Sequence, residues 1–216
     1  MYIPRHFLPE EADVQELLAA VGSADLVTMT GRGLMATQLP WVYDPDAGER
    51  GALLGHLARA NEQWSEPVTG EAMVIVRGSE AYISPNWYAS KAEHHRVVPT
   101  WNYLTAHVYG RLVVHDDPEW LAGQVSRLTD RHEAESARPG ERPWAVADAP
   151  EKYLAGQLRA IVGVELAISR VEAKFKLSQN RPAADVAGVA AGLDARGRAG
   201  DAAVAAAVRR HDPHQR

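Results

Sequence analysis

The stretch Val164-Glu165-Leu166-Ala167-Ile168-Ser169-Arg170-Val171-Glu172-Ala173-Lys174-Phe175-Lys176-Leu177 alternates apolar and polar side chains, as a β-strand with one buried face does. Its apolar residues fall on even positions up to Ile168 and on odd positions from Val171 onward. Because a one-residue shift moves the buried side chains to the other face of a strand, we predict a β-bulge near Ser169-Arg170. Barrels use such bulges to turn corners.

Shorter strands are expected upstream, where runs rich in β-branched residues alternate with Gly or Pro clusters. We predict strands over residues 26–30, 35–39, 52–54, 72–76, 81–83 and 100–114. Helical spacing of apolar residues predicts helices over residues 9–21, 117–132 and 150–162. The chain is therefore expected to be mainly β with peripheral helices, an α+β protein whose strands form an antiparallel barrel or sandwich.

The C-terminal segment differs from the rest in composition. Residues 183–216 are rich in Ala, Gly and Arg, and we predict two weak helices there, one containing Val186, Val189 and Leu193 and one over residues 200–210. The last residues, 211–216, are expected to be disordered. We therefore predict a main domain over residues 1–182 and a helical extension over residues 183–216, which is an appendage or a dimer contact.

The composition excludes several function classes. The 216 residues are 46% hydrophobic and 24% charged, as in a globular protein, and the absence of cysteine rules out disulfides and thiolate ligands. The formal net charge of −5 argues against direct DNA binding, because phosphate-neutralising surfaces are basic. The sequence contains no signal peptide and no apolar run of transmembrane length, so we expect a cytoplasmic protein without a membrane partner.

Three familiar motifs do not carry a function here. Gly31-Arg32-Gly33-Leu34-Met35-Ala36 matches a dinucleotide-binding pattern, but an extended segment follows where a helix would be needed, so we predict a hairpin turn. The histidines lack metal-ligand spacing, and no metal site is predicted. No serine lies in a G-x-S-x-G context, so hydrolase chemistry has no support.

Aromatic, hydroxyl and cationic side chains gather in residues 82–91 and 97–103, and further donors lie in residues 56–64 and 174–181. A flavin nucleotide needs such a mixture, because its phosphate requires cationic and hydroxyl donors and its ring requires a flat apolar surface. The same residues have structural alternatives. The aromatic side chains could belong to the core, Arg59 could be a solvated surface residue, and the lysines could protect an edge strand.

Several blocks together resemble the PaiB family over residues 1–182, in order and in spacing. The blocks are Met1-Tyr2-Ile3-Pro4 with His6-Phe7, residues 56–64, Tyr82-Ile83-Ser84-Pro85, residues 97–103 and residues 176–181. Members of this family are described as FMN-binding negative transcriptional regulators. The resemblance implies an FMN-binding split β-barrel, antiparallel and Greek-key-like, that forms a homodimer with the flavin at the subunit interface. It also implies regulation through flavin binding or through a partner.

The resemblance also nominates cofactor-binding residues. It implies phosphate and ribityl contacts by Arg59, Ser84 and Lys91. It implies ring contacts by the backbone of Thr37, Gln38 and Leu39. The rest of the implied pocket comprises His56, Thr100, Trp101, Asn102, Lys176 and Gln179.

Two other functions remain open at this point. Related split barrels use FMN or the cofactor F420 in oxidation and reduction, so the protein could be a flavin-dependent oxidoreductase. Other relatives handle heme, and any of the nine histidines could be an axial ligand of a heme-binding or heme-degrading protein. No catalytic residue is nominated by the sequence.

Overall fold

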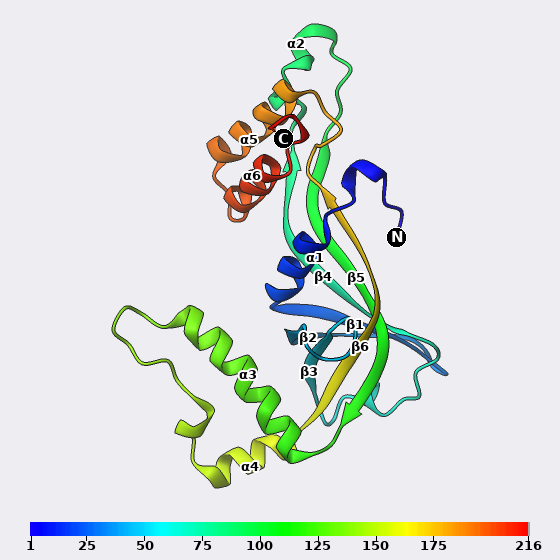
Figure 1. The fold of residues 1–216 in the computed structure, drawn as a ribbon, viewed down its shortest axis with the longest axis vertical. Helices are drawn as coiled ribbons and strands as arrows, with labels where there is room; N and C mark the ends of the chain where they lie inside the picture. Colours follow the sequence, from blue (N-terminus) through cyan, green and yellow to red (C-terminus); the bar gives the residue numbers. More distant parts are fainter. Residues whose placement is uncertain (216) are drawn as a thin grey trace. The chain divides into compact units, whose positions relative to one another are not determined.

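The computed structural model describes residues 1–215, and within them the chain contains six β-strands and six α-helices (Figure 1). The strands are β1 (Ser23–Thr30), β2 (Gly33–Asp44), β3 (Ala52–Ala58), β4 (Ala72–Ile83), β5 (Thr100–His115) and β6 (Ile161–Lys176). The helices are α1 (Glu11–Ala19), α2 (Ser90–His94), α3 (Pro118–Ser136), α4 (Glu151–Arg159), α5 (Ala183–Arg196) and α6 (Asp201–Arg210). Short 3-10 helices cover Arg5–Phe7, Glu62–Trp64, Pro85–Trp87, Val146–Asp148 and Pro213–Gln215. The predicted α+β class is confirmed.

The strands form a closed antiparallel barrel in the order β1-β2-β3-β6-β5-β4. β1 pairs with β2 on one side and with β4 on the other, where Leu26 lies opposite Val74. β3 pairs with β6, from Ala52 opposite Ala167 to Ala58 opposite Ile161. This pairing of strands far apart in sequence confirms the Greek-key-like barrel and excludes the sandwich alternative.

The glycine-rich motif is a hairpin turn, as predicted. Gly31 and Arg32 connect β1 to β2, and Thr30 lies directly opposite Gly33 in the antiparallel register. Gly33 has φ +103°, a conformation that a residue with a side chain rarely adopts. No helix N-terminus follows the motif, so the dinucleotide interpretation is excluded.

Several strand predictions were too short, including that over residues 52–54, where β3 covers Ala52–Ala58. Residues 72–76 and 81–83 belong to one strand, β4, because the intervening polar residues lie on solvent-exposed or half-exposed positions of a continuous strand. β2 continues through Pro40 to Asp44. Pro40 is tolerated because it is the last residue paired with β1, and pairing passes to β3 from Trp41 onward.

The shift of the buried face in β6 lies where the sequence predicted it. Val164, Leu166 and Ile168 are buried on even positions, and Ala173 and Phe175 are buried on odd positions. Ser169 and Arg170 between them are both exposed. The change of face is thus confirmed at these two residues.

The chain forms two compact units. The barrel unit comprises Glu16–Val76 and His107–Val171, and the terminal unit comprises Met1–Gln15, Arg77–Ala106 and Glu172–Arg216. The strands β4, β5 and β6 contribute residues to both. Residue 182 lies inside the terminal unit, and the predicted domain boundary there stays a prediction.

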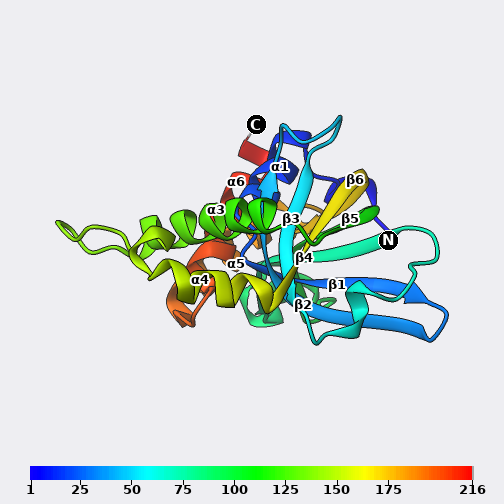
Figure 2. The same ribbon diagram turned by 90° about the horizontal axis from the view of Figure 1, so that it is seen from below.

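In the barrel unit, α3 begins at Asp117, whose carboxylate accepts a hydrogen bond from the backbone N–H of Trp120 at 3.0 Å. The ring of Trp120 then lies on Gly163 of β6, where a Cβ atom would come within 2.2 Å of the indole. A glycine at this position therefore lets α3 approach the sheet. α3 and α4 lie side by side (Figures 1 and 2).

In the terminal unit, α5 and α6 form the two helices predicted for the alanine-rich segment (Figure 1). Val189, Leu193 and Val204 are fully buried there. The last residues were expected to be disordered, but Pro213–Gln215 forms a 3-10 helix in contact with the rest of the unit, since His214 bonds to the carbonyl oxygen of Arg181. Arg216 lies outside the described residues.

None of the helices within residues 1–215 has the length and apolar content needed to cross a bilayer.

Candidate functional site

The residues nominated by the sequence fall into both units, and each group is described by itself. Five lie in the barrel unit: Thr37, Gln38, Leu39, His56 and Arg59. Seven lie in the terminal unit: Ser84, Lys91, Thr100, Trp101, Asn102, Lys176 and Gln179.

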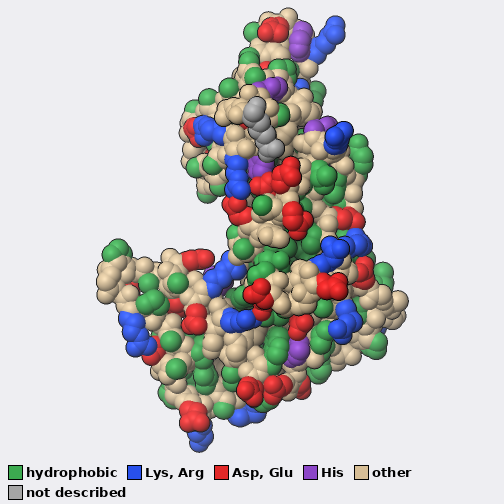
Figure 3. Space-filling model, in the orientation of Figure 1, with side chains coloured by type: hydrophobic (Ala, Val, Ile, Leu, Met, Phe, Trp, Pro, Cys, Tyr) green, Lys and Arg blue, Asp and Glu red, His purple; other side chains and the backbone are tan. Residues whose placement is uncertain are grey.

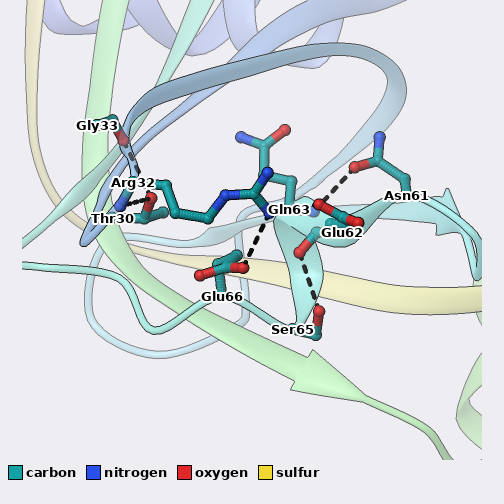
Figure 4. Close-up of polar contacts among 8 residues, drawn as sticks. All are labelled: Thr30, Arg32, Gly33, Asn61, Glu62, Gln63, Ser65 and Glu66. Carbon is teal, nitrogen blue, oxygen red and sulfur yellow. Dashed lines mark hydrogen bonds and ion pairs between the residues drawn. The ribbon is translucent and has the colours of Figure 1, made fainter.

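Thr37 belongs to a hydrogen-bond network that links β2 to the 3-10 helix Glu62–Trp64. Its hydroxyl donates to Oε1 of Gln63 at 2.6 Å and accepts from Nδ2 of Asn61 at 3.0 Å. Gln63 is only 1% exposed. Asn61 caps the 3-10 helix by accepting from the backbone N–H of Gln63 at 2.9 Å (Figure 4). The sequence did not single out Asn61 or Gln63, because nothing local links them to a strand two dozen residues away.

The backbone of Thr37, Gln38 and Leu39 lies at an incompletely paired edge. These residues pair with Leu26, Asp25 and Ala24 of β1. In the part of the chain that the structure describes, the register with β3 covers only Trp41–Asp44. The second edge of β2 before Trp41 therefore has no strand neighbour in that register and can offer backbone groups to a ligand.

Arg59 is already engaged in several hydrogen bonds. Its Nε donates to the carbonyl oxygen of Arg159 at 2.8 Å, and one Nη donates to that of Ile161 at 3.0 Å. The guanidinium also binds both carboxylate oxygens of Asp116, at 3.0 Å for one of them. This pairing raises the pKa of Arg59 and lowers that of Asp116, chiefly through the hydrogen bond. Arg59 thus ties the end of β3 to the starts of α3 and β6.

His56 bonds to a residue of α3. Its Nδ1 lies 3.0 Å from Oε1 of Gln124, which is buried. Among the described residues, the Nε2 of Gln124 has no hydrogen-bond partner. Within residues 1–215, His56 forms no hydrogen bond with Thr37 or Arg59, so these three candidates occupy separate hydrogen-bond groups.

In the terminal unit, Lys176 is the centre of one group. Its ammonium donates to Oγ1 of Thr100 at 2.5 Å and to the carbonyl oxygen of Trp101 at 2.7 Å. Burial lowers the pKa of Lys176, and the nearby cations Lys174 and Arg181 lower it further. Within residues 1–215 no carboxylate forms an ion pair with it. The third ammonium hydrogen and the hydroxyl hydrogen of Thr100 remain able to bind an anion.

Asn102 and Gln179 lie beside this group and shape the end of β6. Nδ2 of the fully buried Asn102 donates to Oγ of Ser178 at 3.0 Å. Gln179 closes the turn by donating to the carbonyl oxygen of Phe175 and accepting from the N–H of Leu177, both at 2.7 Å. Ser178 has φ +70°, which is rare for a residue with a side chain. The sequence around Ser178, a polar segment after a strand, did not predict this backbone conformation.

Ser84 and Lys91 form a second group around Asn86. The Ser84 hydroxyl accepts from the backbone N–H of Asn86 at 3.2 Å and caps the 3-10 helix Pro85–Trp87. The ammonium of Lys91 donates to Oδ1 of Asn86 at 2.5 Å. In the described part of the chain neither side chain bonds to Lys176, so Ser84 and Lys91 are not joined to the Lys176 group by hydrogen bonds.

The aromatic residues divide between core and surface. Tyr88 is buried and lies under the guanidinium of Arg181, with 4.7 Å from Cζ to the ring centroid. Trp101 is 52% exposed and meets Tyr82, itself 38% exposed, edge to face at 6.1 Å. The core alternative therefore describes Tyr88, whereas the indole of Trp101 is half-exposed and offers a flat surface.

Charges are mixed on the face of the molecule that Figure 3 shows, where Lys and Arg side chains are interspersed with Asp and Glu. Many of the arginines are paired, such as Arg127 with Asp44 and Arg142 with Asp148. This pattern is unlike the clustered cations of a surface that binds a DNA backbone.

Comparisons with known proteins identify a matching family and a relative of this chain. Residues 1–170 match the model of a family described as "Putative FMN-binding domain". Protease synthase and sporulation protein PAI 2 of Bacillus subtilis is 30% identical over 187 residues, which are 86% of this chain and 85% of that protein.

Two solved structures share the fold. Conserved hypothetical protein Rv2991 from Mycobacterium tuberculosis matches with a TM-score of 0.57 at 11% identity, over 84% of this chain and 94% of that one. The FAD and heme binding protein from Mycobacterium smegmatis matches with a TM-score of 0.50 at 17% identity, over 77% of this chain and 71% of that one.

Proposed function

This chain belongs to the PaiB family, and from that membership we propose that it is a flavoprotein that binds FMN without a covalent bond. The residues present fit such a cofactor. Bound FMN would supply electron-transfer chemistry, and the protein would supply binding and orientation.

The Lys176 group is the observation that carries this proposal. A half-buried ammonium without a carboxylate partner, with two further cations nearby, is electrostatically unfavourable until an anion binds. Lys176 and Thr100 together offer a cationic donor and a hydroxyl donor, which are the groups that a phosphate monoester needs. Trp101, whose carbonyl oxygen accepts from Lys176, also has a half-exposed indole. A phosphorylated, flat aromatic compound such as FMN suits this combination.

The backbone edge of Thr37–Leu39, taken by itself within the barrel unit, also supports flavin binding. A flavin ring carries carbonyl and ring-nitrogen groups along one side, and these pair with backbone donors and acceptors. The unpaired edge of β2 offers such groups.

For the cellular role we propose regulation of transcription through flavin binding or through a partner, with the protein acting as a homodimer. The relative from Bacillus subtilis carries a name that refers to protease synthesis and sporulation. The net charge of −5 and the mixed surface charge favour a partner over direct contact with DNA. Sedimentation of the purified protein tests the dimer, and a gel shift whose strength falls steeply with salt would contradict the indirect role.

The deciding experiment is the visible absorption spectrum of the purified protein before and after FMN is added and unbound flavin is dialysed away. Retained flavin bands support the proposal. A heme band instead, or no retained chromophore, overturns it. If flavin is retained, reduction by NADH or NADPH under anaerobic conditions would favour a flavin-dependent oxidoreductase over a regulator.

A further inference from the structure

Gln63 connects both strands of the β1–β2 hairpin through a single buried side chain. Its Nε2 donates to Oγ1 of Thr28 at 3.0 Å and to the carbonyl oxygen of Leu26 at 3.2 Å, both on β1. The same nitrogen lies 3.3 Å from the carbonyl oxygen of Met35 on β2. Its Oε1 accepts from the hydroxyl of Thr37, also on β2, at 2.6 Å. The amide therefore fixes the two strands relative to each other.

The 3-10 helix that carries Gln63 also holds the hairpin at its turn. Arg32, in the turn, forms ion pairs with Glu62 and with Glu66, the latter at 3.2 Å (Figure 4). Asn61, which caps the 3-10 helix, bonds to Thr37. Residues 61–66 thus contact the hairpin in three ways. Glu62 and Glu66 pair with Arg32 at the turn, Gln63 bonds to both strands, and Asn61 bonds to β2.

This support lies where β2 lacks a second strand neighbour. Up to Pro40, β2 pairs with β1 on one side but lies outside the β3 register on the other. An apolar side chain at position 63 would fill the same space. A buried amide with four partners does more, because its bonds are directional and specify where Met35 and Thr37 lie.

We propose that Gln63 is a positioning residue for the flavin ring. By holding Met35 and Thr37, it presents the backbone edge of Thr37–Leu39 in one fixed position for the ring. This inference rests on the proposed FMN binding. Gln63 itself lies too deep to touch a ligand, since it is 1% exposed.

The test compares Gln63→Met, which keeps the volume and removes the directional bonds, with Val162→Ala, which removes buried volume from β6 of the same unit. The dissociation constant of FMN is measured by quenching of its fluorescence, the shape of the visible absorption band of bound FMN is recorded, and thermal melting reports stability. Loss of positioning should weaken FMN binding by about tenfold, a typical effect of one or two hydrogen bonds, and should change the band shape. Val162→Ala should lower the melting temperature with neither change.

A second pair of variants leaves Gln63 in place, so the idea remains testable if Gln63→Met does not fold. Thr28→Ser keeps the hydroxyl that accepts from Nε2 of Gln63 and should bind FMN like the wild type. Thr28→Val lacks it and should reproduce the weaker binding and the altered band. Because both residues act in one network, Gln63→Met and Thr28→Val together should cost less affinity than the sum of the two.

Two results would overturn the inference in distinguishable ways. If wild-type protein retains no FMN, the proposed function fails and the inference fails with it. If the wild type binds FMN, but Gln63→Met or Thr28→Val binds it with unchanged affinity and unchanged band shape, Gln63 has only a structural role.

Discussion

The ammonium group of Lys176 donates a 2.7 Å hydrogen bond to the carbonyl oxygen of Trp101, and no carboxylate in residues 1–215 forms an ion pair with it. The neighbouring Lys174 lies near three aromatic rings, those of Tyr2, Phe7 and Tyr103, at 5.7 to 5.9 Å from their centroids, whereas Lys176 lies near one, that of Phe7, at 5.9 Å. The rings therefore stabilise the charge of Lys174 more than that of Lys176. The ammonium of Lys176 keeps one hydrogen that an anion could accept.

The first prediction concerns the affinity for FMN. Replacement of Lys176 by Met should weaken FMN binding by about 10- to 100-fold, because a hydrogen bond to a charged group contributes about 1.5 to 3 kcal/mol. Isothermal titration or fluorescence quenching measures the change. Lys152→Met, on the exposed face of α4, is the charge-matched control and should bind FMN normally. Equal affinities of the two variants would remove Lys176 from the site.

A pH titration of FMN affinity tests the same residue independently. The folded pKa of Lys176 is lowered by burial and by nearby cations, so in the free protein the ammonium loses its proton below the usual lysine range. The dissociation constant of FMN should be flat at neutral pH and rise once the pH passes this lowered pKa, because the neutral amine no longer attracts the phosphate. Lys176→Arg keeps its charge in this range. In Lys176→Arg the dissociation constant of FMN should change with pH only through ionisation of the flavin. The same pH dependence in the wild type and in Lys176→Arg would contradict the assignment.

Lys176 also affects stability in the same alkaline range. Because its folded pKa lies below its unfolded pKa, the unfolded chain binds more protons between the two values, and the stability of the free protein should rise with pH there. Lys176→Met should lack this rise, and urea unfolding at several alkaline pH values measures it.

Arg59 requires variants that separate structure from ligand binding. Arg59→Ala and Asp116→Asn should both lower the melting temperature at pH 7, because each breaks the link between β3 and α3. If Arg59 also contacts the phosphate, Arg59→Ala should weaken FMN binding, whereas Asp116→Asn should not, since it frees the guanidinium. Parallel losses of affinity in the two variants would assign Arg59 to structure alone.

The same pair predicts an acid dependence of stability. The pKa of Asp116 is lowered from 3.8 by the hydrogen bond from Arg59. A carboxylate with a lowered folded pKa stabilises the protein above its unfolded pKa, and this contribution disappears as the pH falls through the folded value. The advantage of wild type over Asp116→Asn should therefore vanish in strong acid, as thermal melting across pH would show.

The local sequence specified some features of this molecule and left others open. The change of face at Ser169-Arg170 and the turn at Gly31-Arg32 were predictable because period and turn chemistry act within a few residues. The bond between Gln63 and Thr37 could not be predicted, because the two residues are 26 positions apart in the sequence and meet only in the folded barrel. The engagement of Arg59 by Asp116 was missed for the same reason.

Ser178 offers a test of backbone strain near the Lys176 group. Its φ of +70° costs a residue with a side chain about 1 kcal/mol relative to glycine. Ser178→Ala keeps this strain and leaves the buried Asn102 without its partner, so it should lower the free energy of unfolding by about 1 to 3 kcal/mol. Ser178→Gly loses the same bond but relieves the strain, and should be more stable than Ser178→Ala by about 1 kcal/mol. Equal stabilities in urea denaturation would show that the backbone carries no such strain.

The packing of α5 on Trp87 yields the last prediction. A Cβ atom at Gly192 would lie 2.3 Å from the Trp87 ring, and one at Gly188 would lie 2.0 Å from the Trp87 carbonyl oxygen. Each substitution by Ala should therefore lower the free energy of unfolding by about 1 to 3 kcal/mol, although alanine favours a helix over glycine. In a Trp87→Ala background the ring is absent but the carbonyl remains, so Gly192→Ala should become neutral or stabilising while Gly188→Ala still destabilises. Urea denaturation of the single and double variants measures this difference. If Gly192→Ala costs the same in both backgrounds, contact with the indole is not what requires glycine there.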